Sequence, residues 1–205
     1  MFSFLYASLR GPAGRRNSAL AVAGLSALTL AGCGGSSSGG GGLASNSGSG
    51  GSGSLNAQFS AVMASNAVTS DFSTSNVGGV LTPPAPIVGS TLLVTGATVP
   101  SNNTARQIIL TVSDTTLTVG KAYPLTDTNS LSYVDTFDIN GKMQRAWIST
   151  GGTATIDSIS GKTYKFHLTK VTLVPVDGTT TTPIATVTPG TGTFTVDGTG
   201  TATLP

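Results

Sequence analysis

His167 is the single histidine of the chain, and histidine is the residue type that most often transfers protons in enzymes. A hydrolytic triad needs an imidazole oriented beside a nucleophile, usually on a loop or at a strand end. His167 instead follows Phe166 and precedes Leu168 in a segment of alternating polar and apolar residues. The alternation predicts an exposed histidine on a strand, without a catalytic role.

Paired carboxylates are the second candidate chemistry, and they would have to be aspartates because the chain contains no glutamate. Asp135 and Asp138 are the closest suitable pair, and they precede an Asn140–Gly141 turn signal, where aspartate commonly caps loops. The stretch 135–141 also has the oxygen donors of a calcium loop, but it lacks the bidentate glutamate and its first ligand is out of register. We therefore expect a plain hairpin here, with no metal or cofactor.

Aromatic side chains offer a third possibility, a platform on which a sugar ring could stack. The candidate stacking residues are Trp147, Tyr123, Tyr133 and Arg145, the last of which shares a face with Trp147. The competing interpretation is that a domain of this size needs its few aromatic residues for its core. Both interpretations remain open at the level of sequence.

Composition indicates a β-protein that does not bind nucleic acid. Charged residues make up 9% of the chain, while threonine, serine and glycine are abundant, and threonine suits a pleated strand. Three of the ten Lys and Arg residues precede residue 33, so the rest of the chain carries seven basic residues against eight aspartates. A near-neutral domain lacks the basic surface that phosphate neutralisation requires.

The N-terminal segment has the features of a secretory signal. Residues 1–17 carry three arginines and no acidic residue, and residues 18–31 form an apolar run too short to span a membrane. The pair Arg15–Arg16 has some likeness to a twin-arginine signal, but Ser18 and Ala19 stand where that signal prefers Phe-Leu. We therefore expect residues 1–32 to be a signal peptide.

The apolar run ends in Leu30-Ala31-Gly32-Cys33, which resembles the lipobox of bacterial lipoproteins at every position. The resemblance implies cleavage between Gly32 and Cys33, a diacylglycerol on the Cys33 thiol, and anchoring of the mature protein to a membrane of the cell envelope. Several acyl chains can hold a protein on a bilayer without a spanning helix. Because Gly34 rather than aspartate follows Cys33, the resemblance also implies sorting to the outer membrane in a host that has one.

Residues 33–54 predict a flexible tether after the lipidated cysteine, since residues 34–54 are almost entirely glycine and serine. Such a segment spans roughly 25 Å as a random coil and about 70 Å when stretched. Cys33 is the only cysteine, so no disulfide is expected beyond it. We expect residues 55–205 to form one domain that folds without the tether.

The predicted domain is all-β. Central strands are expected at 90–97 and 106–113, further strands at 143–149, 152–159 and 162–168, and closing strands at 193–196 and 201–204. The alternation slips by one residue near Thr169–Lys170, which predicts a β-bulge or a change of sheet. Turn signals stand at Asn140–Gly141, Ser160–Gly161, Asp177–Gly178 and Asp197–Gly198.

The spacing of the strands predicts an antiparallel β-sandwich, with a partly closed β-barrel as the alternative. Residues 55–68 could form either a strand or a short helix.

Residues 88–197 resemble uncharacterised β-sandwich domains of bacterial secreted lipoproteins. The shared motifs are a Gly-x-Tyr-x-Leu step, a Gly-x-x-x-Ile-x-x-Ile hairpin and a final Gly-x-Phe strand. They correspond to Gly120, Tyr123 and Leu125 (with one extra residue and Pro124 inserted), to Gly152, Ile156 and Ile159, and to Gly192 and Phe194. That group has no established activity, so the resemblance supports the fold.

Taken together, these features predict a membrane-anchored lipoprotein outside the cytoplasm, with a β-domain that binds or scaffolds a partner and is not an enzyme. An envelope glycan or an envelope protein would be the partner. A carbohydrate-binding module is the alternative, followed by a glycan or peptide hydrolase. One histidine, no glutamate and scattered aspartates leave little for general acid–base catalysis.

Overall fold

A computed structural model of the chain describes residues 52–60, 71–85, 89–101, 104–136, 143–181 and 186–205. These residues form strands and turns without a helix, which confirms the all-β prediction. The predicted signal peptide at 1–32, the predicted lipidation site Cys33, residues 34–51 of the predicted tether, and the predicted turn at 140–141 lie outside the described residues.

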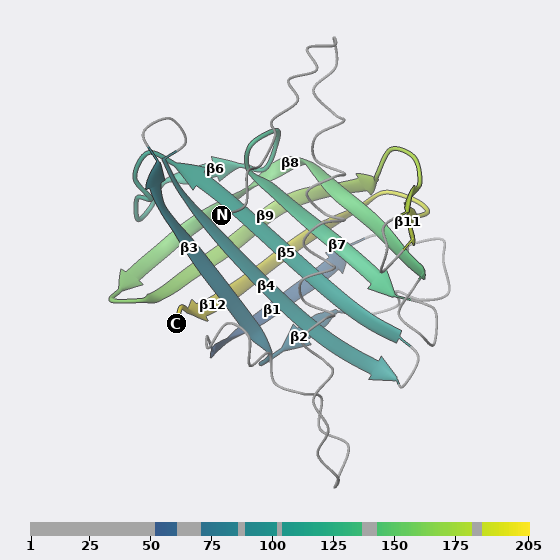
Figure 1. Cartoon of the computed structure of the whole chain (residues 1–205), viewed down its shortest axis with the longest axis horizontal. Coiled ribbons are helices and arrows are strands. Elements are labelled where there is room, and N and C mark those ends of the chain that lie inside the picture. Colours follow the sequence, from purple (N-terminus) through teal and green to yellow (C-terminus); the bar gives the residue numbers. More distant parts are fainter. Residues whose placement is uncertain (1–51, 61–70, 86–88, 102–103, 137–142, 182–185) are drawn as a thin grey trace, which may run out of the picture.

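Within the part of the chain that the structure describes, twelve strands belong to one sheet. Figure 1 shows how the labelled strands curve around the interior. In chain order they are β1 (Ser52–Ser60), β2 (Phe72–Thr74), β3 (Val77–Ala85), β4 (Gly89–Ser101), β5 (Thr104–Asp114), β6 (Ala122–Pro124), β7 (Ser130–Thr136), β8 (Met143–Ser160), β9 (Thr163–Pro175), β10 (Thr180–Thr181), β11 (Thr186–Pro189) and β12 (Phe194–Thr203). The main path runs β2-β1-β12-β9-β8-β7-β5-β4-β3. All pairings are antiparallel except that of β11 with β8.

The sheet is nearly closed and barrel-shaped, which agrees with both architectures that the sequence left open. Its two edge strands, β2 and β3, follow each other in the chain and approach β4 together. The Thr74 hydroxyl donates to the carbonyl of Ala97 at 2.5 Å, and the Ala97 N–H donates to the carbonyl of Asn76 at 3.1 Å. These bonds join the β2–β3 corner to β4, so the sheet closes around its core at this point.

The interior is filled by side chains that alternate inward along each strand. Tyr164, Phe166 and Leu168 are buried, while Lys165 is exposed and the His167 side chain is 41% exposed, as the sequence predicts. A second, smaller cluster on the opposite face of the sheet contains Val134, Ala146, Val176 and Val187.

The predicted irregularity in β9 is confirmed as a β-bulge. Val171 is paired with Val196 and Leu168 with Gly198, so three steps along β9 face two steps along β12. Lys170 has a φ of 48°, and its N–H donates to the Asp197 carboxylate at 2.8 Å. The bulge returns Val171 and Leu173 to the inner face, where both are fully buried.

The prediction of a turn at Asp197–Gly198 is wrong, because the two predicted closing strands are one strand, β12, and Asp197 lies opposite the β9 bulge. Similarly, the two strands expected at 143–149 and 152–159 are the single strand β8. The turn at Ser160–Gly161 is confirmed: Ser160 pairs with Thr163, and Gly161 has a φ of 57°.

The predicted start of the domain at Leu55 is three residues late. Ser52, Gly53 and Ser54 already pair with Thr203, Ala202 and Thr201 in β12. A Cβ atom on Gly53 would lie 1.9 Å from the Thr201 carbonyl oxygen, so the strand is closely packed there. Residues 55–60, which the sequence left as strand or helix, are strand; residues 61–68 lie outside the described residues.

Replacing Gly152 with alanine should lower the free energy of unfolding by about 2–4 kcal/mol, whereas Gly151→Ala should change it little. Gly152 has a φ of 87°, and an added Cβ would lie 2.4 Å from Val171 Cα and 2.5 Å from the Lys170 carbonyl oxygen. At Gly151 nothing lies within 4 Å of the added atom. Urea denaturation of both variants measures the difference. Equal losses of stability in the two variants would contradict the close packing of Gly152 against Lys170 and Val171.

Candidate functional site

Three charged side chains gather near the ends of β5, β7 and β8. Asp135 lies between Arg106 and Arg145 in the cross-strand register, and it forms an ion pair with Arg145 at 2.5 Å. The Asp135 side chain is 1% exposed, and the Arg145 side chain is 19% exposed. Loss of contact with water raises the pKa of Asp135, while Arg145 and Arg106 partly counteract that effect.

Arg106 lies among aromatic rings in the same region. Its Nε–H donates to the Tyr133 hydroxyl at 2.8 Å, and its guanidinium lies 5.4–5.7 Å from the ring centroids of Phe59, Phe72 and Tyr133. Burial raises the pKa of Tyr133 to about 12, despite the opposing effect of Arg106. Tyr133 therefore stays protonated at neutral pH, and these contacts hold the buried cation in the core.

The proposed stacking platform is not present as an exposed surface, which corrects the sequence-based hypothesis. Trp147 and Tyr133 are fully buried and Tyr123 is 2% exposed, so none of them can present a ring face to a ligand. Trp147 and Tyr133 do lie together, with ring centroids 5.5 Å apart, but as part of the core. Arg145, the fourth candidate, forms an ion pair with Asp135.

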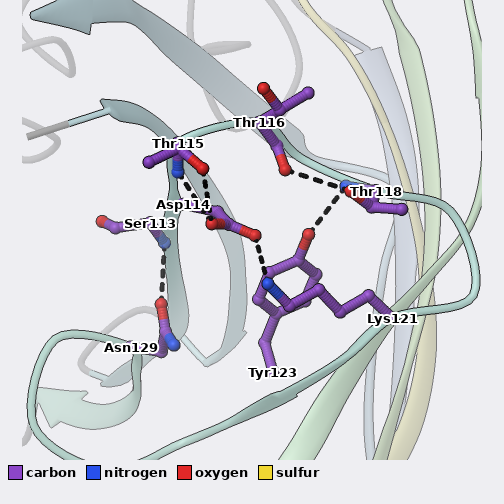
Figure 2. Close-up of polar contacts among 8 residues, drawn as sticks. All are labelled: Ser113, Asp114, Thr115, Thr116, Thr118, Lys121, Tyr123 and Asn129. Carbon is purple, nitrogen blue, oxygen red and sulfur yellow. Dashed lines mark hydrogen bonds and ion pairs between the residues drawn. The ribbon is translucent and has the colours of Figure 1, made fainter.

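Tyr123 holds the segment between β5 and β6 in place (Figure 2). Its hydroxyl accepts a hydrogen bond from the Thr118 N–H at 2.7 Å, and the Lys121 ammonium lies 5.2 Å from its ring centroid. Lys121 also contacts the Asp114 carboxylate at 2.6 Å, and this hydrogen bond lowers the pKa of Asp114. Tyr123 is thus a structural residue, distant in register from the Trp147 cluster.

The carboxylates considered for catalysis or calcium binding do not form such a site among the described residues. Asp135 is held by Arg145, and Asp138 lies outside the described residues. In the part of the chain that the structure describes, no three His, Cys, Asp or Glu side chains are grouped as metal ligands would be. His167 forms a surface pair with Asp157, with 2.6 Å between Nδ1 and the carboxylate oxygen.

An open groove of about 530 Å³ lies on the outer face of the sheet over β1, β2, β9 and β12. Its polar lining comes from outward positions on these strands and from the residue that precedes β2. These residues are Asn56, Gln58, Asp71, Ser73, His167, Asp197 and Thr199. Most of them are exposed, and the outer face here is therefore a hollowed polar surface that can exchange hydrogen bonds with a ligand.

Sequence reasoning did not identify this groove. Asn56 and Ser73 lie far from Thr199 and His167 in the chain, and they meet only because β1 pairs with both β2 and β12. The sequence does show which residues of β1 and β12 are polar and alternate with apolar ones. It does not show that these two sets of polar residues lie side by side. Among the sequence candidates, His167 alone lies in the groove.

Comparisons of the chain with protein-family models, with curated proteins and with solved structures gave no match. In the described residues, no helix has the length and apolar character of a membrane span.

Proposed function

We propose that this chain is a lipid-anchored protein of the cell envelope whose β-domain binds or organises a partner without catalysing a reaction. The observation that carries the proposal is the lipobox Leu30-Ala31-Gly32-Cys33, followed by a glycine- and serine-rich segment up to the first strand. Strand β1 begins at Ser52, so residues 34–51 separate Cys33 from the domain. At about 3.4 Å per residue, a chain of that length reaches at most about 60 Å.

The geometry of the domain supports a binding or structural role over catalysis. Two acidic side chains, Asp114 and Asp135, form ion pairs with Lys121 and Arg145, and the Asp157 carboxylate lies 2.6 Å from His167 Nδ1. A general acid or base needs a group within hydrogen-bonding reach of a substrate, and Asp135 is buried beneath the surface. Sugar recognition by stacking on Trp147, Tyr123 or Tyr133 has no support, because these rings lie in the core.

Changing Cys33 to serine should abolish lipid attachment. The physical reason is that thioether formation needs the thiol, and the chain offers no second cysteine. Cells expressing the protein are grown with an alkyne fatty acid, and the label on the purified chain is measured. Ser36→Ala, in the same segment, is the matched control and should label as the unchanged protein does.

The variant should also leave the membrane fraction or remain unprocessed, since the acyl chains supply about 0.8 kcal/mol per buried methylene group. Equal labelling of Cys33→Ser and the unchanged protein would exclude this mode of anchoring.

A further inference from the structure

Four polar side chains stand in one row across the outer groove. Ser73 is the cross-strand partner of Asn56, Asn56 of Thr199, and Thr199 of His167. Directly opposed residues of neighbouring strands point to the same face, and neighbouring strands lie about 4.8 Å apart. The row therefore crosses the groove and presents one polar group on each of β2, β1, β12 and β9, at regular intervals.

Two members of the row are oriented by hydrogen bonds that leave a defined group for a ligand. The Ser73 hydroxyl donates to Asn56 Oδ1 at 2.6 Å, so the Asn56 amide nitrogen is left as a donor. His167 Nδ1 contacts the Asp157 carboxylate at 2.6 Å, which leaves Nε2 on the free side of the ring. Orientation before binding lowers the entropic cost of association.

Asp197 supplies an acceptor at a second position in the groove. One of its carboxylate oxygens accepts the Lys170 N–H at the β9 bulge, at 2.8 Å, and the other can accept from a ligand. Gln58 is its cross-strand partner on β1. At the rim, the Asp71 carbonyl accepts a hydrogen bond from Arg106 at 3.4 Å, which ties the groove to the buried cluster.

The donors and acceptors that line the groove are mixed, and its lining contains aspartates but no lysine or arginine. Asp71 and Asp197 line the groove, and Asp157 stands behind His167, so a phosphate or sulfate group would meet carboxylates. A hydroxyl group both donates and accepts, and it can therefore satisfy an amide N–H, a carboxylate and an imidazole in turn. Neutral ligands carrying several hydroxyl groups fit this surface best.

We infer that the outer groove over β1, β2, β9 and β12 binds a short segment of a neutral oligosaccharide. The inference rests on the proposed binding role of the domain and names its ligand class. It does not depend on the lipid at Cys33, so failure of sugar binding and failure of lipid labelling are distinct results. Binding uses hydrogen bonds rather than stacking, because the large aromatic rings Trp147, Tyr123 and Tyr133 are buried.

The test titrates chitotetraose and cellotetraose into the full chain purified in detergent, by isothermal calorimetry. At least one of these sugars should bind with a dissociation constant in the millimolar range or below, typical of hydrogen-bonded surface sites. Asn56→Asp keeps the oxygen that accepts from Ser73 and removes the amide donor. Asp197→Asn keeps an oxygen that accepts from the Lys170 N–H and replaces the other carboxylate oxygen with an amide nitrogen, which cannot accept a hydrogen bond. Each variant should weaken sugar binding about fivefold, the effect of losing one hydrogen bond.

Lys165→Gln is the matched control, because Lys165 lies on the outer face of β9 two residues from His167 but does not line the groove. It should bind as the unchanged chain does. Tetralysine is the competing probe: a cation site would bind it more tightly in Asn56→Asp and more weakly in Asp197→Asn. The inference would be overturned if Asn56→Asp raised and Asp197→Asn lowered the affinity for tetralysine. It would also be overturned if neither sugar bound at about 10 mM.

Discussion

Replacing Phe166 with alanine should lower the free energy of unfolding by about 3–5 kcal/mol, a large share of the 5–15 kcal/mol typical of a domain. The Phe166 side chain is 2% exposed and belongs to the main core. Its ring lies directly against Gly200 of β12, where an added Cβ would be 2.2 Å from Phe166 Cζ. Truncation therefore leaves a cavity that the closely packed neighbouring strand cannot readily fill.

His167→Ala is the control for this prediction, because His167 is adjacent in sequence and points to the other face. Its side chain is 41% exposed, and its loss should cost about 0.5 kcal/mol. Denaturant melts of both variants measure the two values. A greater loss for His167→Ala than for Phe166→Ala would show that the register of β9 is inverted.

Replacing Arg145 with methionine should lower the free energy of unfolding by about 3 kcal/mol at about pH 8. The change removes the ion-pair partner of Asp135, whose side chain is 1% exposed. Among the described residues, Arg106 is then the basic side chain that still lowers the pKa of Asp135. That pKa, already raised by burial, should therefore rise further.

The loss of stability in Arg145→Met should depend on pH, and its direction follows from the raised pKa of Asp135. A carboxyl whose pKa is higher in the folded state than in the unfolded state stabilises the fold at low pH, and that contribution is lost as the pH rises through the folded-state pKa. Arg145→Met should therefore be closer in stability to the unchanged protein at about pH 5 than at about pH 8. Thermal melts across this range give the difference.

Lys121→Met is the matched control, since Lys121 also pairs with an aspartate, Asp114, at 2.6 Å. The Lys121 side chain is half exposed, and ion pairs in contact with water contribute little to stability. The description of a buried ion pair would be contradicted if Lys121→Met lost as much stability as Arg145→Met. It would also be contradicted if the stability loss of Arg145→Met did not change with pH.

The inward and outward faces of single strands could be predicted because they depend on local alternation. Tyr164 and Phe166 point inward and Lys165 points outward, as expected from a period of two residues. The change of phase at Thr169–Lys170 was also predictable, as either a β-bulge or a change of sheet, and the pairing of β9 with β12 selects the bulge. In both cases the signal lies within a few consecutive residues.

Residue pairs that commonly form turns predicted turns less reliably where the same residues pair with distant strands. Asp197–Gly198 has the composition of a hairpin turn, yet Asp197 bonds to the Lys170 N–H and Gly198 lies against β1. A Cβ atom on Gly198 would be 2.6 Å from the Asn56 carbonyl oxygen. Pairing with strands on both sides keeps β12 extended, and no local pattern reports that pairing.

By itself the sequence determined the all-β class, the phase of its clearest strands and the motif that predicts lipid attachment at Cys33, because each is written in neighbouring residues. The tertiary structure alone decided which aromatic residues are core and which polar residues share a surface. Trp147 is covered because the turn before β12 passes over it, with its indole N–H donating to the Gly192 carbonyl at 3.1 Å. Asn56, Thr199 and His167 form one row because β12 pairs between β1 and β9. Such long-range pairings are set by the packing of the whole sheet, which the order of residues in any one strand does not encode.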